Sequence, residues 1–353
     1  MTKPVYNIAV TGLNAIDSPG PGVAVIRGLL DSTHFDARII GLAYESLEPG
    51  IYMDDIVDVV YHVPYPGAGL EALYERISYI HSKERIDVII PNFDAELYSY
   101  IKLEERLKQL GIALCLPTMQ QFEERQKVNL SDFGERYGIN VPKSMVVNDL
   151  SDLPEVGKRF DYPVVVKGKY YDAGIAYNSE QVRSYFLKLS ARWGVPVIIQ
   201  EFIHGAEFNV TGLGDGTGET IAAVPMRKQY ITDKGKAWGG ISISDERMLQ
   251  MTRDFIKKTK WRGGFELELM KDKQNEFYLL EINPRMPAWI YLAVGVGQNI
   301  PEAVVRLALG EKVPSYTEYI VGKMFVRYAW DMIVDVNDFH EISAMGELRT
   351  LKR

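Results

Sequence analysis

Two runs of the sequence carry carboxylate and amide side chains at alternate positions, which is the feature most able to support chemistry. Glu266 and Glu268 lie two residues apart in one apolar run, and Glu281 and Asn283 lie two residues apart in the next. In a β-strand such pairs share one face. If the strands pair, a carboxylate from each can converge with the amide oxygen on a Mg²⁺ ion whose other ligands are phosphate oxygens. An amphipathic hairpin with a solvated acidic face is the alternative.

Basic side chains that could face a polyphosphate lie elsewhere in the chain. Lys167 and Lys169 share a face at the end of the β-branched run 164–166, and Arg285 follows the acidic run with a planar cation suited to phosphate oxygens. At ~4 Å and an effective dielectric near 20, one charge pair contributes roughly 4 kcal/mol. The alternatives are strand-end lysines that extend to water and, for Lys127, a charged and exposed helix.

A third segment changes from apolar to polar at residues 198–207. Its strand-like part leads into Glu201, Phe202 and Ile203, and a second acid follows at Glu207. A turn of this kind can offer backbone N–H and C=O groups to a purine and a carboxylate to ribose hydroxyls. An ordinary strand followed by a loop is the alternative.

The elements that would position these residues begin with alternating strand and helix patterns over the first ~117 residues. Continuous apolar runs such as 88–90 suit strands buried on both faces, and the order strand–helix–strand predicts an open α/β sheet with parallel strands. We expect helices at 70–85 and 95–110, the latter with Asp94 as its cap, a residue that could also face the cleft. The expected strands are Tyr6–Thr11, Arg38–Leu42, Asp58–Tyr61, Asp87–Pro91 and Ile112–Leu116.

From Pro117 onward the pattern changes to α+β. A helix is predicted to end at Gly138, and Asp215-Gly216 between two apolar runs predicts a hairpin. Ser244 is expected to cap a helix that runs to about Lys258, and Pro301 and Gly310 to bracket another. Further strands are expected at 143–147, 164–169, 197–203, 208–213, 220–227, 265–270 and 277–282.

Composition narrows the class of protein. The 353 residues include 40 Lys and Arg against 47 Asp and Glu, a net charge of −7 that argues against a nucleic-acid-binding protein. No apolar run approaches the ~18 residues of a membrane span, and the N-terminus has no apolar signal core. The single cysteine, Cys115, lies in an apolar run and excludes a disulfide framework. We therefore expect a cytoplasmic protein with no membrane or nucleic-acid partner.

Taken together, the order and spacing of these motifs resemble the ATP-grasp superfamily, in particular carbamoyl-phosphate-synthase-like and carboxylate–amine ligase members. The resemblance rests on Lys127, the Val-Val-Val-Lys run to Lys167, the segment 200–207, Glu268 and the Glu-Ile-Asn-Pro-Arg run 281–285. It implies a pre-ATP-grasp domain with an open parallel sheet at 1–117, a first ATP-grasp lobe at 118–200 and a second lobe with a C-terminal tail at 201–353.

The resemblance also implies the function and the role of each residue. The expected activity is an ATP- and Mg²⁺-dependent ligase, with Mn²⁺ as an alternative ion, that activates a small carboxylate as an acyl phosphate and joins it to an amine. A homodimer is expected because dimers are frequent in related enzymes. The implied roles are phosphate binding by Lys127 and Lys167, with Lys169 beside them; adenine binding by Glu201, Phe202 and Ile203; ribose binding by Glu207; metal binding by Glu268, Glu281 and Asn283; and contact with the transferred phosphate or acyl phosphate by Arg285.

The sequence departs from the family pattern in places and leaves alternatives open. The phosphate lid after Lys169 reads Tyr-Tyr-Asp-Ala-Gly at 170–174, with a single glycine. Glu266 could replace Glu268 as the metal ligand. Pocket or surface roles remain open for Arg227, Lys228, Lys236, Trp289, Tyr291 and Arg327. A bicarbonate-activating carboxylase or carbamoyl-phosphate-type enzyme and a non-catalytic ATP sensor are the alternative functions, whereas the glycines near residues 12–22 lack the G-x-G-x-x-G spacing of a dinucleotide site.

Overall fold

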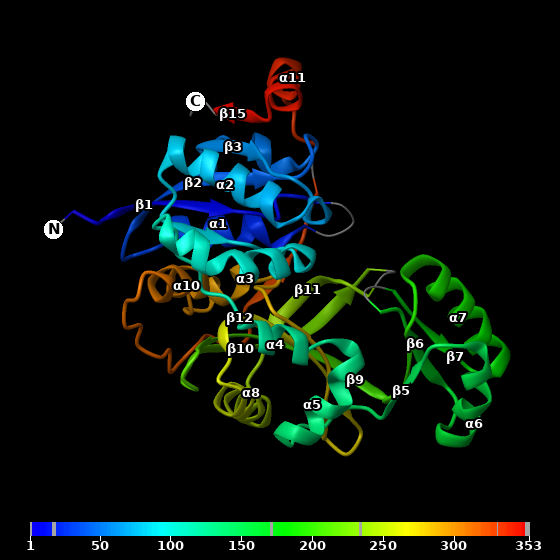
Figure 1. Ribbon diagram of the computed structural model, residues 1–353. Helices are drawn as coiled ribbons and strands as arrows, with labels where there is room; N and C mark the ends of the chain where they lie inside the picture. The colour runs from blue at the N-terminus through cyan, green and yellow to red at the C-terminus, as the bar shows by residue number, and fades with distance from the viewer. Residues whose placement is uncertain (1, 16–18, 170–171, 233–234, 330, 350–353) are drawn as a thin grey trace. The chain divides into compact units, whose positions relative to one another are not determined.

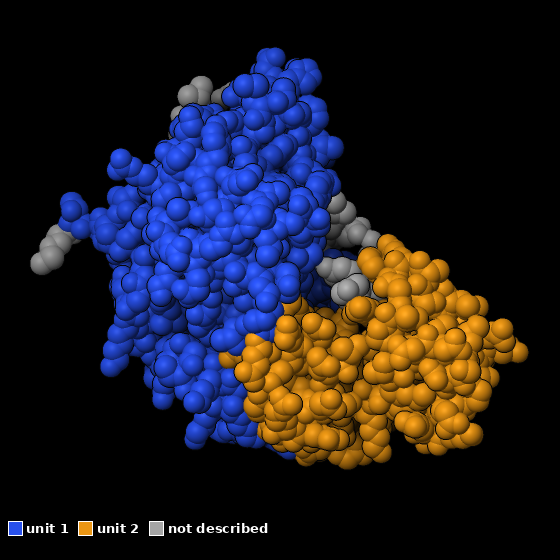
Figure 2. All heavy atoms as spheres, in the orientation of Figure 1, with its two compact units in different colours: residues 1–119, 209–266, 283–353 blue, residues 120–208, 267–282 orange. Residues whose placement is uncertain are grey.

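The chain divides into two compact units in a computed structural model that describes residues 2–15, 19–169, 172–232, 235–329 and 331–349. Figure 1 traces the elements and Figure 2 colours the units. The first unit comprises residues 1–119, 209–266 and 283–353, and the second comprises 120–208 and 267–282. The three-domain division expected from the sequence stays a prediction.

The first unit contains a five-stranded sheet in the order β15-β3-β2-β1-β4. The pairs β1–β2, β1–β4 and β2–β3 are parallel, as the buried apolar runs predicted, and β15 is antiparallel to β3. Helix α1 lies between β1 and β2 along the chain, and α2 lies between β3 and β4 (Figure 1). The bounds are β1 Val5–Val10, β2 Asp36–Ala43, β3 Val59–His62, β4 Val88–Ile90, β15 Glu347–Arg349, α1 Pro21–Leu30, α2 Leu70–Glu84, α3 Asp94–Gln109 and α11 Val336–Met345.

Two sequence expectations are wrong in this region. The predicted strand Ile112–Leu116 is reduced to a single parallel bridge between Ala113 and Val88. Asp94 is the first residue of α3 and does not cap it. The buried carboxylate of Glu96, in the first turn, instead accepts the backbone N–H groups of Asn92 and Phe93 at 2.9 Å each.

A six-stranded sheet follows in the order β13-β12-β9-β10-β11-β14. Strands β9, β12 and β13 each pass from one unit into the other, so the two units share these strands along the chain. The Asp215-Gly216 hairpin joins β9 to β10 as predicted, with Gly216 at φ +88°. The bounds are β9 Gly205–Asp215, β10 Thr220–Ile231, β11 Ala237–Ser242, β12 Arg262–Asp272, β13 Phe277–Asn283, β14 Met324–Val326, α8 Glu246–Thr259, α9 Tyr291–Gly295 and α10 Ile300–Ala308.

One hydrophobic core joins distant parts of the sequence in the first unit. Ile8, Val10 and Ile39 of the parallel sheet belong to the same buried cluster as Val224 of β10 and Val305 of α10. The predicted cap of α8 is wrong by one residue: Asp245 rather than Ser244 accepts the N–H groups of Arg247 and Met248.

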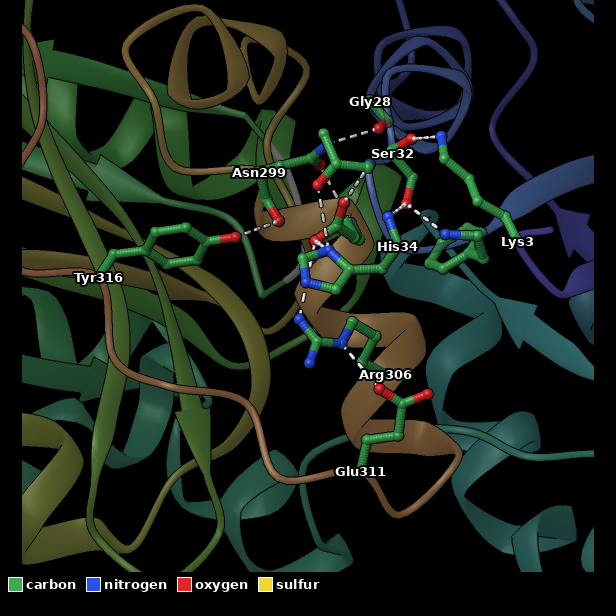
Figure 3. Close-up of polar contacts among 11 residues, drawn as sticks. Lys3, Gly28, Ser32, His34, Asn299, Arg306, Glu311 and Tyr316 are labelled. Atoms are coloured by element: carbon green, nitrogen blue, oxygen red, sulfur yellow. Dashed lines mark hydrogen bonds and ion pairs between the residues drawn. The ribbon is translucent and has the colours of Figure 1, made fainter. Parts of the chain in front are cut away.

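Polar contacts fix α10 to the end of α1 within the first unit (Figure 3). The Asn299 side chain donates to the Gly28 carbonyl at 2.7 Å and caps α10 through the Glu302 N–H. The buried Glu302 carboxylate lies 2.7 Å from His34 Nδ1 and accepts the Thr33 N–H. The start of α10 is thereby held against the loop that follows α1.

The second unit is built on an antiparallel four-stranded sheet in the order β5-β8-β6-β7. Helix α7 covers it with Val182, Phe186 and Leu189, which pack against buried valines of β6 and β8. The bounds are α4 Met119–Glu124, α5 Leu130–Tyr137, β5 Ser144–Val147, α6 Val156–Arg159, β6 Val164–Lys167, β7 Ala173–Ala176, α7 Ser179–Trp193 and β8 Val197–Glu201. In the ranges that the structure describes, no helix is both long and apolar enough to cross a bilayer.

Candidate active site

Lys167 is the centre of a charged cluster in the second unit. It ends β6, where it lies opposite Ala173 of β7 and Ile198 of β8, and its valine neighbours fix the strand in the core. Burial lowers the pKa of the Lys167 ammonium to about 8. Three carboxylates raise that pKa and one ammonium lowers it further, namely Glu281, Glu268 and Glu207 on one side and Lys127 on the other.

Lys127 belongs to this cluster and is not a solvated helix residue. It begins a short 3-10 turn at Lys127–Asn129, and its Nζ lies 3.3 Å from Glu281 Oε1. Both side chains are largely buried, with 17% and 27% exposed. Four of the residues predicted from the sequence to bind ATP or metal are thus brought near Lys167 within one unit.

The donor set near Lys167 fits a hard cation that also binds phosphate. Glu268 and Glu281 lie on adjacent strands β12 and β13, and both carboxylates act on the same ammonium. Among the residues with described positions, no three His, Cys, Asp or Glu side chains form a metal-binding group. Two carboxylates suffice for Mg²⁺ when nucleotide oxygens and an amide supply the other ligands.

The predicted adenine and ribose residues follow β8. The Glu201 N–H donates to the Lys143 carbonyl at 2.9 Å, which anchors the end of the strand. Phe202 and Ile203 lie between β8 and β9, outside both strands, and the Phe202 ring contacts the His204 ring edge-on at 4.7 Å between centroids. Glu207 is exposed on β9. Lys169 lies just past β6, and Tyr170 and Tyr171 of the predicted lid fall outside the described residues.

A second cluster, in the first unit, is centred on the buried carboxylate of Glu266. Its Oε1 accepts from Asn209 Nδ2 at 2.8 Å and from Trp289 Nε1 at 2.6 Å, and its Oε2 accepts from Asn283 Nδ2 at 3.0 Å. Glu266 is therefore occupied by three N–H donors. The contact with Glu266 uses the Asn283 amide nitrogen and not its amide oxygen.

Two arginines accompany this cluster. Arg285 Nε lies 2.9 Å from Asp94 Oδ2, and its Nη1 lies 3.7 Å from Glu266 Oε2. Burial lowers the pKa of Arg327 to about 10, while Glu266 acts to raise it. The sequence reasoning missed Asn209 and the role of Trp289. The alternation in Glu207-Phe208-Asn209 was the available signal, since it puts Asn209 on the face of Glu207.

The basic residues near Trp238 belong to the hairpin of β10 and β11. Lys228 Nζ donates to the Gly235 carbonyl at 3.4 Å, and the Lys236 N–H donates to Thr232 Oγ1 at 3.2 Å. Arg227 is exposed on β10 opposite Ile241. These contacts lie within the hairpin between β10 and β11, and an active-site role for the three residues stays a prediction.

Comparison with known proteins supports one family. A model described as "ATP-grasp in the biosynthetic pathway with Ter operon" matches residues 194–329. The carbamoyl phosphate synthase large chain of Thermotoga maritima is 26% identical over 297 residues, which cover 77% of this chain and 26% of that protein. The chain thus spans about a quarter of the length of these relatives.

Solved structures share the fold at low sequence identity. Biotin carboxylase from Campylobacter jejuni superposes with a TM-score of 0.72 at 16% identity, covering 91% of this chain and 74% of that one. The L-amino acid ligase of Bacillus licheniformis gives 0.63 at 17% identity, with 87% and 75% covered. The family model over residues 194–329, the related sequences and the shared fold agree with the arrangement around Lys167 and support ATP-grasp superfamily membership.

Proposed function

We propose that this protein is an ATP- and Mg²⁺-dependent ligase that activates a small carboxylate as an acyl phosphate and joins it to an amine, releasing ADP. The observation that carries the proposal is the buried Lys167 ammonium, close to Lys127 and to the carboxylates of Glu268 and Glu281. Three strands and a turn hold these cations and hard oxygen ligands together. A magnesium-bound triphosphate requires groups of both kinds.

The nucleotide residues follow from this cluster. The Lys127 ammonium pairs with the Glu281 carboxylate at 3.3 Å. In the ATP complex, phosphate oxygens would bind this ammonium, and the Glu281 carboxylate would then bind the metal. The backbone of Phe202 and Ile203, outside the strand ladders, would hold the adenine. The remaining roles are Lys167 and Lys169 at the phosphates, Glu201 at the adenine and Glu207 at the ribose.

Glu268, Glu281 and Asn283 would hold the metal. Glu266 is excluded from this role in our proposal because Asn209, Trp289 and Asn283 occupy both of its oxygens. Bound Mg²⁺ would supply charge neutralisation on the β- and γ-phosphates. Mn²⁺, with similar oxygen preference, would substitute.

The chemistry needs positioning rather than a protein nucleophile. A substrate carboxylate oxygen attacks the γ-phosphorus in line as the bond to the ADP oxygen breaks. The amine then attacks the acyl carbon, loses a proton and expels inorganic phosphate. Arg285 and Arg327, both near Glu266, would stabilise the anionic acyl phosphate. The partners are therefore small molecules, and cytoplasmic location stays a prediction.

A carboxylase or carbamoyl-phosphate-type reaction is the second candidate, since the 26%-identical relatives are carbamoyl phosphate synthase large chains. In that reaction the activated carboxylate is bicarbonate. A third candidate, an ATP sensor, would bind nucleotide without turnover. ADP release that requires an organic acid and an amine supports the ligase, release with bicarbonate alone supports the second candidate, and binding without release supports the sensor.

Substitution of the metal ligands tests the site itself. We expect Glu281→Gln and Asn283→Ala each to lower ADP release by at least ~100-fold, since they remove charge and ligands aimed at the transferring phosphate. Glu276→Gln, at a half-buried position directly before β13, is the matched control and should keep wild-type turnover. Normal turnover in the Glu281 and Asn283 variants, with the thermal unfolding temperature unchanged, would remove the metal assignment.

A further inference from the structure

Strand β14 leaves one side of the six-stranded sheet open. It is the last strand in the sheet order and pairs with β11 alone among the described strands. The Arg327 N–H donates to the Trp238 carbonyl at 3.1 Å, and the Ser242 N–H donates to the Lys323 carbonyl at 2.8 Å. Backbone groups alternate in direction along a strand, so those of Met324 and Val326 point away from β11. The edge therefore presents main-chain groups to a further strand.

Apolar side chains line this edge and the segment after it. Met324 and Val326 are 53% and 64% exposed, whereas Phe325 between them packs against the core. Residues 331–335 continue outside any helix or strand, and Ile333 there is 92% exposed, with Met332 and Val334 exposed beside it. Two short segments, 323–327 and 331–335, thus carry exposed apolar side chains on either side of Ala329.

The side chains of these two segments are complementary when the segments are aligned antiparallel. An antiparallel alignment centred on Ala329 puts Lys323 opposite Asp335 and matches apolar residues at the three positions that follow. The apolar pairs are Met324 with Val334, Phe325 with Ile333 and Val326 with Met332. Opposite charges and apolar pairs directly across from each other stabilise an antiparallel ladder. Arg327 falls opposite Asp331, although its guanidinium is already near Glu266.

We propose that β14 is a dimerisation edge, at which segment 323–327 of one chain pairs with segment 331–335 of a second copy about a two-fold axis through Ala329. The contact is isologous, so each copy contributes both segments. The direction of the backbone groups agrees with this pairing. Residues 324 and 326, whose N–H and C=O groups point away from β11, lie opposite 334 and 332 of the second copy and form hydrogen-bonded pairs with them.

The same alignment within one chain would need a tight hairpin at residues 328–330. That connection reads Tyr-Ala-Trp, without the Gly, Asn or Asp that a three-residue turn needs for its left-handed position. A second copy is therefore the occupant that fits.

Oligomeric mass and a cysteine on the axis test this proposal. Light scattering of the full chain should give about twice the chain mass of 40.0 kDa. Val326→Pro removes one outward N–H and leaves the bonds to β11 intact, so it should return the protein to the monomer, whereas the matched control Val326→Thr should stay dimeric. Ala329→Cys should form an intermolecular disulfide under mild oxidation, because residues on the axis of a non-hydrogen-bonded pair lie about 4.5 Å apart.

Disulfide crosslinking through the native cysteine should be low. Cys115 is the only native cysteine, and burial raises its pKa to about 12. Leu47→Cys, at a highly exposed position far from these segments in the sequence, is the control and should stay uncrosslinked. The proposal is overturned if the wild type is monomeric at all concentrations, if Val326→Pro remains dimeric, or if Ala329→Cys crosslinks no more than Leu47→Cys. A monomer with slow amide exchange at Met324 and Val326 would instead indicate the hairpin.

Discussion

At the scale of single residues, two glutamates on one strand have different surroundings. Glu266 and Glu268 are two residues apart on β12, yet Glu266 is closed off by three N–H donors while Glu268 acts on the Lys167 ammonium. A buried carboxylate that accepts several hydrogen bonds is costly to alter, because each donor left without its partner loses about 1–3 kcal/mol. We therefore propose that Glu266 fixes Asn283 and Trp289 and that Glu268 binds the metal.

Exchange of each carboxylate for an amide separates these roles. Glu266→Gln places an amide N–H group against the N–H donors that surround the Glu266 carboxylate. It should therefore lower the free energy of unfolding by roughly 1–3 kcal/mol. Glu268→Gln should leave stability near wild type and abolish ADP release. Urea unfolding and an ADP-release assay on both variants provide the measurements. Equal stability of the two variants would contradict the assignment.

The lowered pKa of Lys167 predicts proton uptake on ATP binding. With a pKa of about 8, half of the free protein lacks this proton at pH 8, and phosphate oxygens would raise the pKa again. We expect uptake of about half a proton at pH 8, almost none below pH 7, and weaker ATP affinity as the pH rises above 8. Calorimetry in buffers of different ionisation enthalpy measures this uptake. Lys167→Arg, which keeps its charge, should bind ATP without it, and identical uptake in that variant would contradict the role of Lys167.

At the scale of elements, the start of α3 is joined to β1 and β4 through Glu96. Besides the two backbone N–H groups, its carboxylate accepts the hydroxyls of Thr11 and Tyr44. Burial raises the pKa of Glu96 to about 7 despite these hydrogen bonds, so the folded chain holds this proton where the unfolded chain has lost it. Its contribution to stability is full below about pH 4.5 and is lost as the pH rises toward 7.

Glu96→Gln isolates this effect, because the amide keeps an acceptor for Thr11 and Asn92, and the Tyr44 hydroxyl can accept from its nitrogen. The unfolding temperature of the wild type should fall between pH 5 and pH 8 relative to that of the variant. Differential scanning calorimetry at several pH values gives the two curves. Parallel curves would show that Glu96 does not titrate in this range.

At the scale of the whole molecule, the C-terminal segment completes the first sheet. Strand β15 pairs with β3, Arg349 binds the buried Glu84 at 2.6 Å, and Leu348 and Ile342 are buried in the core. Figure 1 shows β15 and α11 beside β3. The segment after residue 335 therefore covers the edge of a sheet formed almost 300 positions earlier in the chain.

Loss of one side chain in this segment should affect the stability of the first unit. Leu348→Ala removes a buried leucine and should lower the free energy of unfolding by roughly 2–4 kcal/mol. Met345→Ala, at an exposed position three residues away, should have no measurable effect. Chemical unfolding of both variants measures the difference, and equal values would show that β15 adds nothing to the sheet.

The sequence alone determined the elements with strong local patterns. Buried apolar runs predicted β1, β2 and β4, Gly138 and Gly310 marked helix ends, and alternation placed Glu281 and Asn283 on one face, because periodicity and backbone preferences act over a few residues. Only the tertiary structure decided that Glu266 is enclosed by Asn209 and Trp289, that Lys127 pairs with Glu281, and that β15 joins the first sheet. These outcomes depend on burial and on contacts between residues far apart in the chain, which no local pattern encodes.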